Sequence, residues 1–157
     1  MTTDSARPGR PIPSIVQALN PLVRRLLRLG LPMGQNALLT VRGRTSGEPR
    51  TFPITLLELD GRRYVFAAFG ETNWVRNLRA AGEGTLRHGR RDEPIKAVEL
   101  SFGEAVPVLE SAMKSVLRIK GFGSMVGGWY GLTATASPAD YEQAARDHAG
   151  FELRPAG

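Results

Sequence analysis

The stretch that most constrains the fold is residues 38–77, in which apolar, strand-like segments alternate with short turns. Apolar residues flank the turn 43–50 on both sides, and this turn holds two arginines, two hydroxyl residues, a glutamate, a proline and two glycines. Asp60-Gly61 marks a second, tight turn of the kind that joins hairpin strands. Because hairpin-connected strands pair antiparallel, this stretch predicts an antiparallel sheet and argues against parallel βαβ units.

The same pattern continues along the chain. Six strands are expected, over residues 37–42, 50–59, 62–69, 85–90, 94–102 and 149–154, with the fourth and fifth joined across 91–93. The third has apolar residues at every position of 64–69, so we expect it to be buried on both faces. Helices are expected from Thr72 or Asn73 to Ala81, over 107–120, and from Ser137-Pro138 onward. We interpret the glycine-rich segment 121–131 as a loop. Six hairpin-connected strands favour a small barrel.

The N-terminal part of the chain has a different character. Residues 1–12 are polar and proline-rich and predict a disordered tail, followed by a single domain over 13–157. An amphipathic helix is expected over 21–29, with leucines on one side and Arg24, Arg25 and Arg28 on the other. Two interpretations stay open. The helix packs its apolar face on the domain, or residues 14–29 make peripheral contact with an anionic membrane.

Composition excludes several kinds of chemistry. The chain has no Cys and only two His, His88 and His148, so thiolate nucleophiles, disulfides and a His-based metal site are not expected. No P-loop, Gly-x-Ser-x-Gly or His-Glu-x-x-His motif occurs, and Gly121-Phe122-Gly123 lacks the third glycine of a dinucleotide fingerprint. The net charge of +6 favours an acidic partner such as a phosphorylated cofactor, anionic lipid or nucleic acid. Without a secretory signal or an apolar run long enough to span a bilayer, a cytoplasmic location is expected, with membrane association left open.

An ordered set of motifs carries a family resemblance. The run 38–53 reads LLTVRGRTSGEPRTFP, and it resembles the signature of the deazaflavin-dependent nitroreductase family, in which a strand ends in Gly-Arg-x-Ser-Gly-x-Pro-Arg. The Asp-Gly hairpin, the strand end 65–70 and the segment Asn73–Leu78 follow in the family's order, the last being similar to its Trp-Tyr-x-Asn-Leu. The resemblance covers residues 38 to about 102. It implies an α+β fold, a six-stranded, mainly antiparallel split β-barrel with three or four flanking helices.

The resemblance also implies a cofactor and its site. Family members are common in actinobacteria and bind the 5-deazaflavin coenzyme F420, a polyanion that an Arg-rich loop and a helix N-terminus suit. The first turn is expected to hold its phosphate and acidic tail, the second strand to pass along it, and the third strand end with the following helix to cover the remaining side. The implied cofactor-binding residues are Arg44, Thr45 and Ser46; Arg50, Thr51, Phe52, Pro53, Ile54 and Thr55; Ala67, Ala68 and Phe69; and Asn73, Trp74, Val75, Arg76 and Asn77.

Two positions depart from the family pattern. Thr45 stands where Lys is frequent, and Gly70-Glu71-Thr72 is short and acidic where many members carry a longer, glycine-rich insert with Lys. The expected reaction is hydride transfer from the reduced deazaflavin to a small or lipophilic acceptor such as a quinone, an enone or a nitro compound. Tyr130 is the candidate proton donor or substrate contact, with water as the other donor. Alternatively, Trp129 and Tyr130 only anchor a loop on the barrel.

Other functions are weighed beside this one. Related small barrels bind flavin mononucleotide (FMN), so FMN is the alternative cofactor. A different class is a non-catalytic basic protein at a membrane surface, using the arginines of 21–29 and the cluster 87–91. A nucleic-acid partner is not expected, because no recognition motif occurs and aromatic and basic residues interleave poorly. A metal is not expected, and the protein is taken to be a monomer or homodimer.

Overall fold

The computed structural model describes residues 36–156 of the 157-residue chain. The predicted tail 1–12, the domain boundary at 13, the helix 21–29 and the membrane contact 14–29 therefore lie outside the described residues. Seven strands are described: β1 (Asn36–Arg42), β2 (Pro49–Thr55), β3 (Leu57–Leu59), β4 (Arg62–Phe66), β5 (Glu83–His88), β6 (Arg91–Glu99) and β7 (Gly150–Pro155). Four helices accompany them: α2 (Asn73–Ala81), α3 (Phe102–Leu117), α4 (Phe122–Tyr130) and α5 (Pro138–Asp147).

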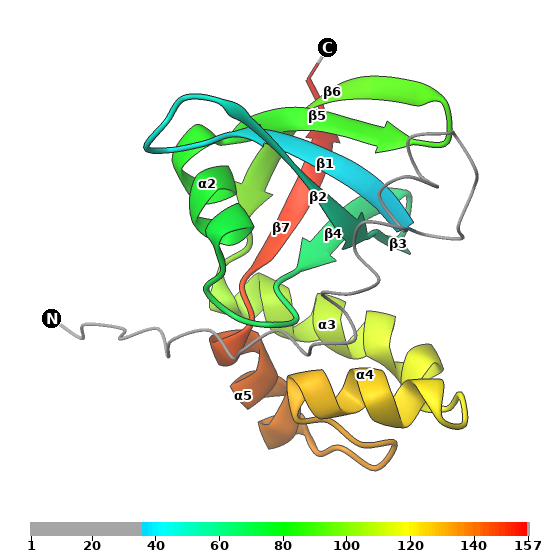
Figure 1. Ribbon diagram of the computed structural model, residues 1–157. Coiled ribbons are helices and arrows are strands. Elements are labelled where there is room, and N and C mark those ends of the chain that lie inside the picture. Colours follow the sequence, from blue (N-terminus) through cyan, green and yellow to red (C-terminus); the bar gives the residue numbers. More distant parts are fainter. Residues whose placement is uncertain (1–35, 157) are drawn as a thin grey trace, which may run out of the picture.

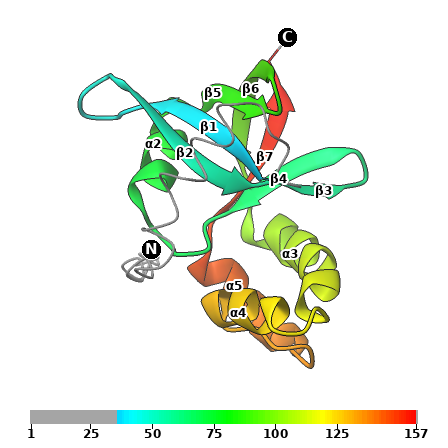
Figure 2. The same cartoon turned by 45° about the vertical axis from the view of Figure 1, so that its right-hand side comes forward.

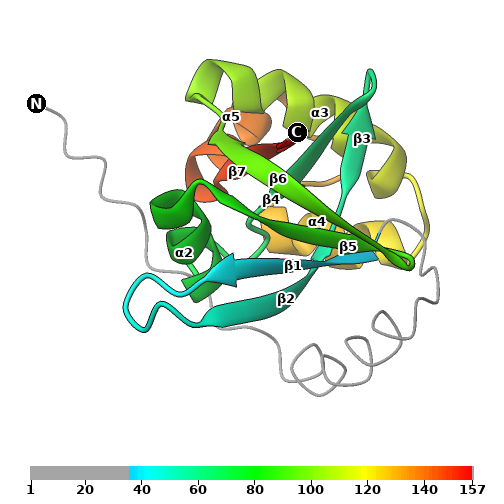
Figure 3. The same cartoon turned by 90° about the horizontal axis from the view of Figure 1, so that it is seen from above.

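The strands form one curled antiparallel sheet in the order β2-β1-β5-β6-β7-β4-β3. The sheet is a half-barrel that holds α2 on one side, while α3, α4 and α5 form a separate layer below it (Figures 1 and 2). Seen from above, β1 and β5 lie across the middle of the view, with the helical layer behind them (Figure 3). The prediction of an α+β fold with an antiparallel sheet is confirmed.

The predicted number of six strands is wrong, because the expected strand 50–59 is two strands. β2 pairs with β1, and β3 pairs with β4, although β2 and β3 are the two terminal strands of the sheet. Leu56, only 2% exposed, is the single residue between them. The chain thus passes from one edge of the curled sheet to the other within one residue, and this passage draws the two edges together.

The fourth and fifth strands were predicted with the wrong turn. His88 pairs with Arg91, so the turn is Gly89-Arg90 and the sheet continues through 91–93. Gly89 has φ of +68°, which fits the first position of a two-residue hairpin loop that begins with glycine. The glycine was the signal for the turn, and the charged run after it belongs to β6.

The helix predicted from Pro107 begins five residues earlier, at Phe102. Ser101 caps it, since its hydroxyl accepts from the Glu104 N–H at 3.3 Å while the Glu104 carboxylate accepts from the Ser101 N–H at 3.0 Å. Pro107 lies inside the helix. This reciprocal capping box satisfies two backbone donors and fixes the helix start, so it outweighs the position of the proline.

Residues 122–130, interpreted as a loop, form α4. A Cβ at Gly123 would lie 2.6 Å from the Val116 carbonyl oxygen, and one at Gly127 would clash with the carbonyl oxygen of Leu132. The glycines therefore allow α4 to pack closely against the end of α3 and the segment that follows α4 itself. Here glycine serves close backbone packing rather than loop flexibility.

Two hydrophobic clusters share the sheet. One lies between the sheet and α2 and includes Leu39, Val65, Val75 and Leu78; the other lies between the sheet and the layer of α3–α5 and includes Phe66. Because successive β4 residues alternate between the clusters, β4 is buried on both faces, as its sequence predicts. No described helix is both long and apolar enough to cross a membrane.

Replacing Leu56 tests the passage between the sheet edges. We expect Leu56→Ala to lower the free energy of unfolding by about 2–5 kcal/mol, because it leaves a cavity where the two edges meet. Glu58→Ala, an exposed position in β3, is the control and should change it by less than about 0.5 kcal/mol. Chemical denaturation followed by circular dichroism measures both, and equal effects would contradict the role given to Leu56.

Candidate functional site

The β1–β2 loop, residues 43–48, is fastened to α2 by one side-chain oxygen. Asn77 Oδ1 accepts from the Arg44 backbone N–H at 3.2 Å and from the Arg44 Nη1 at 2.7 Å. Asn77 is only 5% exposed, so the acceptor of this contact is buried, while the Arg44 side chain reaches it from the exposed loop. Asn77 and Arg44 are 33 positions apart, and their contact joins the loop to the helix as a single unit.

The loop is also ordered from within. Gly43 N–H donates to the Glu48 carbonyl at 2.8 Å, and Glu48 N–H donates to Ser46 Oγ at 3.2 Å. A Cβ at Gly43 would lie 2.9 Å from Ser46 Oγ, so the turn folds back onto a position that only glycine fits without displacing its neighbour. The side chains of Arg44, Thr45 and Ser46 remain exposed. A preformed loop therefore offers a cation and two hydroxyls to solvent.

The N-terminus of α2 lacks the usual capping. Thr72 occupies the N-cap, yet its side chain makes no capping hydrogen bond, and the first turn holds no acidic residue. Thr72 Oγ1 is buried and has no hydrogen-bond partner among residues 36–156. Backbone N–H groups at an uncapped helix start, together with this hydroxyl, make a donor set suited to an anion.

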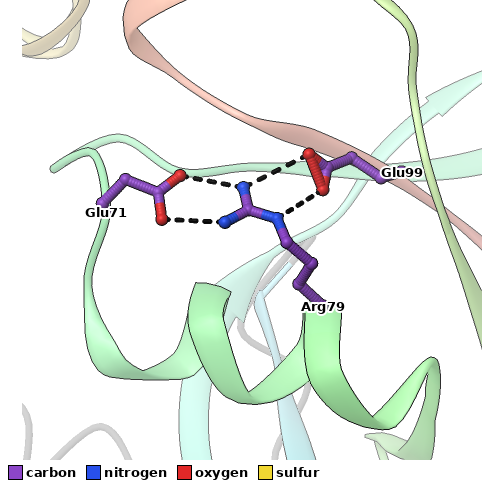
Figure 4. A network of polar contacts seen from close by, with 3 residues as sticks. All are labelled: Glu71, Arg79 and Glu99. Carbon is purple, nitrogen blue, oxygen red and sulfur yellow. Dashed lines mark hydrogen bonds and ion pairs between the residues drawn. The ribbon is translucent and has the colours of Figure 1, made fainter. Parts of the chain in front are cut away.

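Arg79 pairs with the acidic residue in front of α2 (Figure 4). Its Nη1 and Nη2 donate to the two Glu71 oxygens at 2.9 and 2.8 Å, while its Nε donates to Glu99 at 2.7 Å. The hydrogen bonds from Arg79 lower the pKa of Glu71, and the two carboxylates raise the pKa of Arg79. Glu71 is thus paired, although one cation shared by two carboxylates leaves the cluster of Glu71, Arg79 and Glu99 with a net negative charge.

The end of β4 meets the ends of two helices. His148, which follows α5, is 3% exposed, and its Nδ1 lies 2.7 Å from the Ala67 carbonyl oxygen. Because a carbonyl oxygen can only accept, Nδ1 carries the proton. The Tyr130 ring packs against the His148 ring at 4.6 Å between centroids, and Phe69 packs against Trp129 at 5.2 Å. Burial raises the pKa of Tyr130, so its phenol stays protonated at neutral pH.

The predicted site residues divide into those that converge and those that do not. Two groups converge on α2, namely the loop that holds Arg44 and the end of β4 at Ala67. Asn77 of α2 contacts the Arg44 loop, and Gly70, just before α2, donates its N–H to the Ala67 carbonyl. Asn73 and Arg76 are exposed on α2, and Ala68 and Phe69 are half-buried. Val75 is fully buried in the core, and Trp74 packs on Phe151 at 6.5 Å between centroids.

The block 50–55 does not present one face. Arg50, Phe52 and Ile54 pair with Val41, Leu39 and Ala37 and point to the side of α2, where Ile54 is buried; Thr51, Pro53 and Thr55 point to the other side. On that other side a pocket of about 270 Å³ is lined by Leu38, Thr40, Thr51, Thr85, Arg87 and Asp92. A ligand beside α2 can therefore touch alternate side chains of β2, or the backbone of this terminal strand, but not all six side chains.

His148 is the residue that sequence reasoning did not assign to the site. The sequence offered only a signal of low specificity, namely one of two histidines placed just before the last strand. Within the described part of the chain, no group of three or more His, Asp or Glu side chains is placed to hold a metal ion.

Comparison with known proteins identifies the family. A family model described as F420H2-dependent quinone reductase matches residues 21–117, which is more than half of the chain. The chain belongs to this family. Its members are oxidoreductases, so the prediction of an enzyme is confirmed, as is the resemblance to a deazaflavin-dependent family. No curated protein matches the sequence.

Solved structures support the fold of this family member. An F420-H2 dependent reductase (FDR-A) is 20% identical, with 76% of this chain and 94% of that one covered and a TM-score of 0.49. A protein of unknown function from Agrobacterium tumefaciens is 19% identical over 96% of this chain and 59% of its own length, with a TM-score of 0.53. The heme storage protein HutZ from Vibrio cholerae is 11% identical over 88% and 91%, with a TM-score of 0.51. Only the last two, with TM-scores above 0.5, support the fold, and their likeness is one of fold alone.

The Arg79 network predicts how stability responds to acid. The folded-state pKa of Glu71 is lowered, so its pairing adds stability above the ordinary carboxyl pKa of about 4.3, and this stability is lost as the pH falls through the folded value. We expect Arg79→Gln to cost about 1 kcal/mol at pH 7 and to lose less on acidification to pH 3 than the unaltered protein loses.

Arg76→Gln, exposed on the same helix, is the matched control for this substitution and should keep most of the acid dependence. Urea denaturation across this pH range measures both variants. An Arg79→Gln protein with the same pH dependence as the unaltered protein would show that the pairing does not contribute.

Proposed function

We propose that this family member binds coenzyme F420 and transfers a hydride from its reduced form to a quinone or another lipophilic acceptor. The observation that carries the proposal is the contact of Arg44 with Asn77 Oδ1, because it holds a cationic, hydroxyl-rich loop against an uncapped helix. Family membership supplies the deazaflavin and the quinone as expectations. Enones and nitro compounds are further acceptors within the same proposal.

The donor set beside α2 fits the anionic part of the cofactor. Arg44, Thr45 and Ser46 would hold the phosphate and acidic tail, with the N–H groups at the start of α2 and the Thr72 hydroxyl as further donors. Arg76, exposed on α2, adds a second cation beside Arg44 of the loop. Arg79 pairs with Glu71 and so reduces the repulsion between this carboxylate and the acidic tail.

The apolar wall of the site would come from two strands. Ala68 and Phe69 follow β4, and Phe52 of β2 is half-buried on the side of α2. Hydrogen bonds fix the turn at Ala67, whose N–H donates to the Ala149 carbonyl at 2.8 Å and whose carbonyl accepts from His148. A turn held at both of its backbone groups can keep a flat ring in one orientation, and orientation is what hydride transfer requires.

Tyr130 would provide the proton for the acceptor. When bound, the reduced deazaflavin supplies the hydride, and a quinone needs a hydride and a proton to become a hydroquinone. The Tyr130 phenol carries its proton at neutral pH and its ring packs on the His148 ring, so a proton is held at a fixed place. Because burial raises its pKa, the phenol is a weak acid, and it would release the proton only to the strongly basic oxygen that hydride transfer creates on the acceptor. Water is the alternative donor.

FMN remains the alternative cofactor, because the same loop and helix start suit its phosphate. A fluorescence titration of the protein with oxidised coenzyme F420, with FMN in parallel, tests the proposal directly. Saturable binding of the deazaflavin with no binding of FMN is expected. Binding of FMN in preference to F420 would be consistent with the fold and would contradict the assignment of F420 as the cofactor.

Arg44 is the first residue to replace in this assay. We expect Arg44→Ala to weaken F420 binding by about tenfold to a hundredfold, the usual loss for a charge-assisted hydrogen bond. Arg90→Ala, in the β5–β6 turn, removes an equal charge and should leave the affinity unchanged. Thermal melting of each variant separates loss of the anion contact from loss of the loop. An unchanged affinity in a folded Arg44→Ala protein would remove this residue from the site.

Tyr130→Phe tests the proton donor while keeping the ring on His148. The substitution should lower kcat for quinone reduction by about a hundredfold and leave F420 affinity unchanged, because only the hydroxyl is lost. Tyr141→Phe, a buried position in α5, is the matched control with kcat unchanged. If Tyr130→Phe keeps its kcat, the proton comes from elsewhere, water being the first alternative.

A further inference from the structure

His148 lies where the chain leaves α5 and is about to enter β7, which rises from the helical layer beside β4 (Figures 1 and 2). The His148 backbone N–H donates to the Ala144 carbonyl at 2.9 Å and so closes the last turn of α5. Two residues later, the Gly150 carbonyl accepts from the Leu100 N–H at 2.8 Å, and a Cβ at Gly150 would clash with the Phe66 ring. Because the backbone is fixed on both sides of His148, its imidazole has a defined place.

One nitrogen of this imidazole holds the turn after β4. Nδ1 lies 2.7 Å from the Ala67 carbonyl oxygen, 81 positions away in sequence, and His148 is buried. The same carbonyl accepts from the Gly70 N–H at 3.1 Å, while the Ala67 N–H donates to the Ala149 carbonyl at 2.8 Å. The turn 67–70, which carries the predicted wall of the cofactor site, is therefore fastened to the segment that contains His148.

The ring of the same imidazole packs on Tyr130, the last residue of α4. The two ring centroids are 4.6 Å apart and the ring planes are tilted by 52°, an arrangement typical of favourable ring pairs. Tyr130 is half-buried, and within residues 36–156 no hydrogen bond of its hydroxyl is present. Packing of the ring, rather than a hydrogen bond, thus decides where the phenol lies.

The two groups that His148 touches have to be placed relative to each other. In the proposed reaction a hydride and a proton reach the same acceptor, so the wall that orients the cofactor and the phenol that holds the proton must keep a fixed separation. A second contact, between Phe69 and Trp129 at 5.2 Å, also joins the turn 67–70 to the end of α4. His148 differs from this pair because it contacts one group by a hydrogen bond and the other by its ring.

We propose that His148 is a positioning residue, which sets the proton donor of the site against the wall that orients the cofactor. The hydrogen bond from Nδ1 fixes the turn 67–70, and the ring fixes the Tyr130 phenol. In naming the cofactor and the donor, this inference rests on the proposed function. The two contacts themselves do not depend on it.

Two substitutions of His148 separate its two contacts. His148→Phe keeps a ring against Tyr130 but loses the hydrogen bond, and the Ala67 carbonyl retains the Gly70 N–H as a donor. We expect this variant to bind F420 about tenfold more weakly and to keep its kcat at saturating F420. His148→Asn keeps an N–H for the Ala67 carbonyl but loses the ring. It should keep the F420 affinity and lower kcat about tenfold, because the phenol is no longer held in place.

The controls show whether these losses come from positioning. His88, the only other histidine of the chain, is exposed in β5, and His88→Phe and His88→Asn should change neither F420 affinity nor kcat. A double-mutant cycle provides the second control. In a Tyr130→Phe background, His148→Asn should cause no further loss of kcat, because the hydroxyl that the ring positions is already absent.

A histidine that serves stability alone would give another pattern. Both variants would then lose affinity and kcat together, in proportion to their melting temperatures, and this result would overturn the inference. An equal fall of kcat on His148→Asn with and without the Tyr130 hydroxyl would overturn it as well. Should His148→Asn fail to fold, His148→Phe still decides the matter, because it must lose affinity and keep kcat.

A measurement on the protein without cofactor tests the hydrogen bond itself. Proton NMR should show a slowly exchanging imidazole N–H signal that is lost in His148→Phe and kept in His88→Phe. Absence of this signal from the unaltered protein would contradict the role of Nδ1. If the unaltered protein shows the signal but binds no F420, the proposed function fails while the contact stands, so the two failures are recognised separately.

Discussion

The constraint on which the rest of the structure depends is the passage of one chain between the two edges of its own sheet. β2 and β3 are neighbours in sequence and terminal strands of the same sheet, and only Leu56 separates them. A flat sheet of seven strands could not satisfy this connection, because its edges would lie about 30 Å apart at the usual strand spacing. The sheet must therefore curl, and the curl creates the enclosed side that α2 covers and the lower face that α3–α5 cover.

The polar contacts of the site fasten parts that this curl brings together. Asn77 ties the β1–β2 loop to α2, Arg79 ties the segment before α2 to β6, and His148 ties the end of β4 to the end of α5. Each contact joins residues that are at least 20 positions apart or that belong to different layers. The site is thus held by specific hydrogen bonds between elements, each shielded to a different degree, while the two hydrophobic clusters supply the bulk of the stability.

A feature of this structure could be predicted from the sequence when the interaction behind it joins residues that are close together in the chain. Local signals were sufficient for the antiparallel pairing, for the start of α2 near Asn73, and for the burial of β4 on both faces, because hairpin turns, caps and alternation act over a few residues. The glycines of α4 looked like loop residues, since their close contacts with Val116 and Leu132 exist only in the folded structure. His148 was not assigned to the site, and the faces of β2 were not separated, because both depend on partners that pairing and packing bring from distant parts of the chain.

The place of β7 in the sheet has a consequence for how the chain is made. β7 follows the other six strands of the described part of the chain, yet it lies inside the sheet between β6 and β4. Until it emerges from the ribosome, β6 and β4 each have an unpaired edge, and the two halves of the sheet have no strand to join them. The nascent chain therefore passes through a stage in which β6 and β4 present open edges besides those of the terminal strands, and such a stage is exposed to aggregation and to chaperone binding. The sheet is complete only once β7 has joined its two halves.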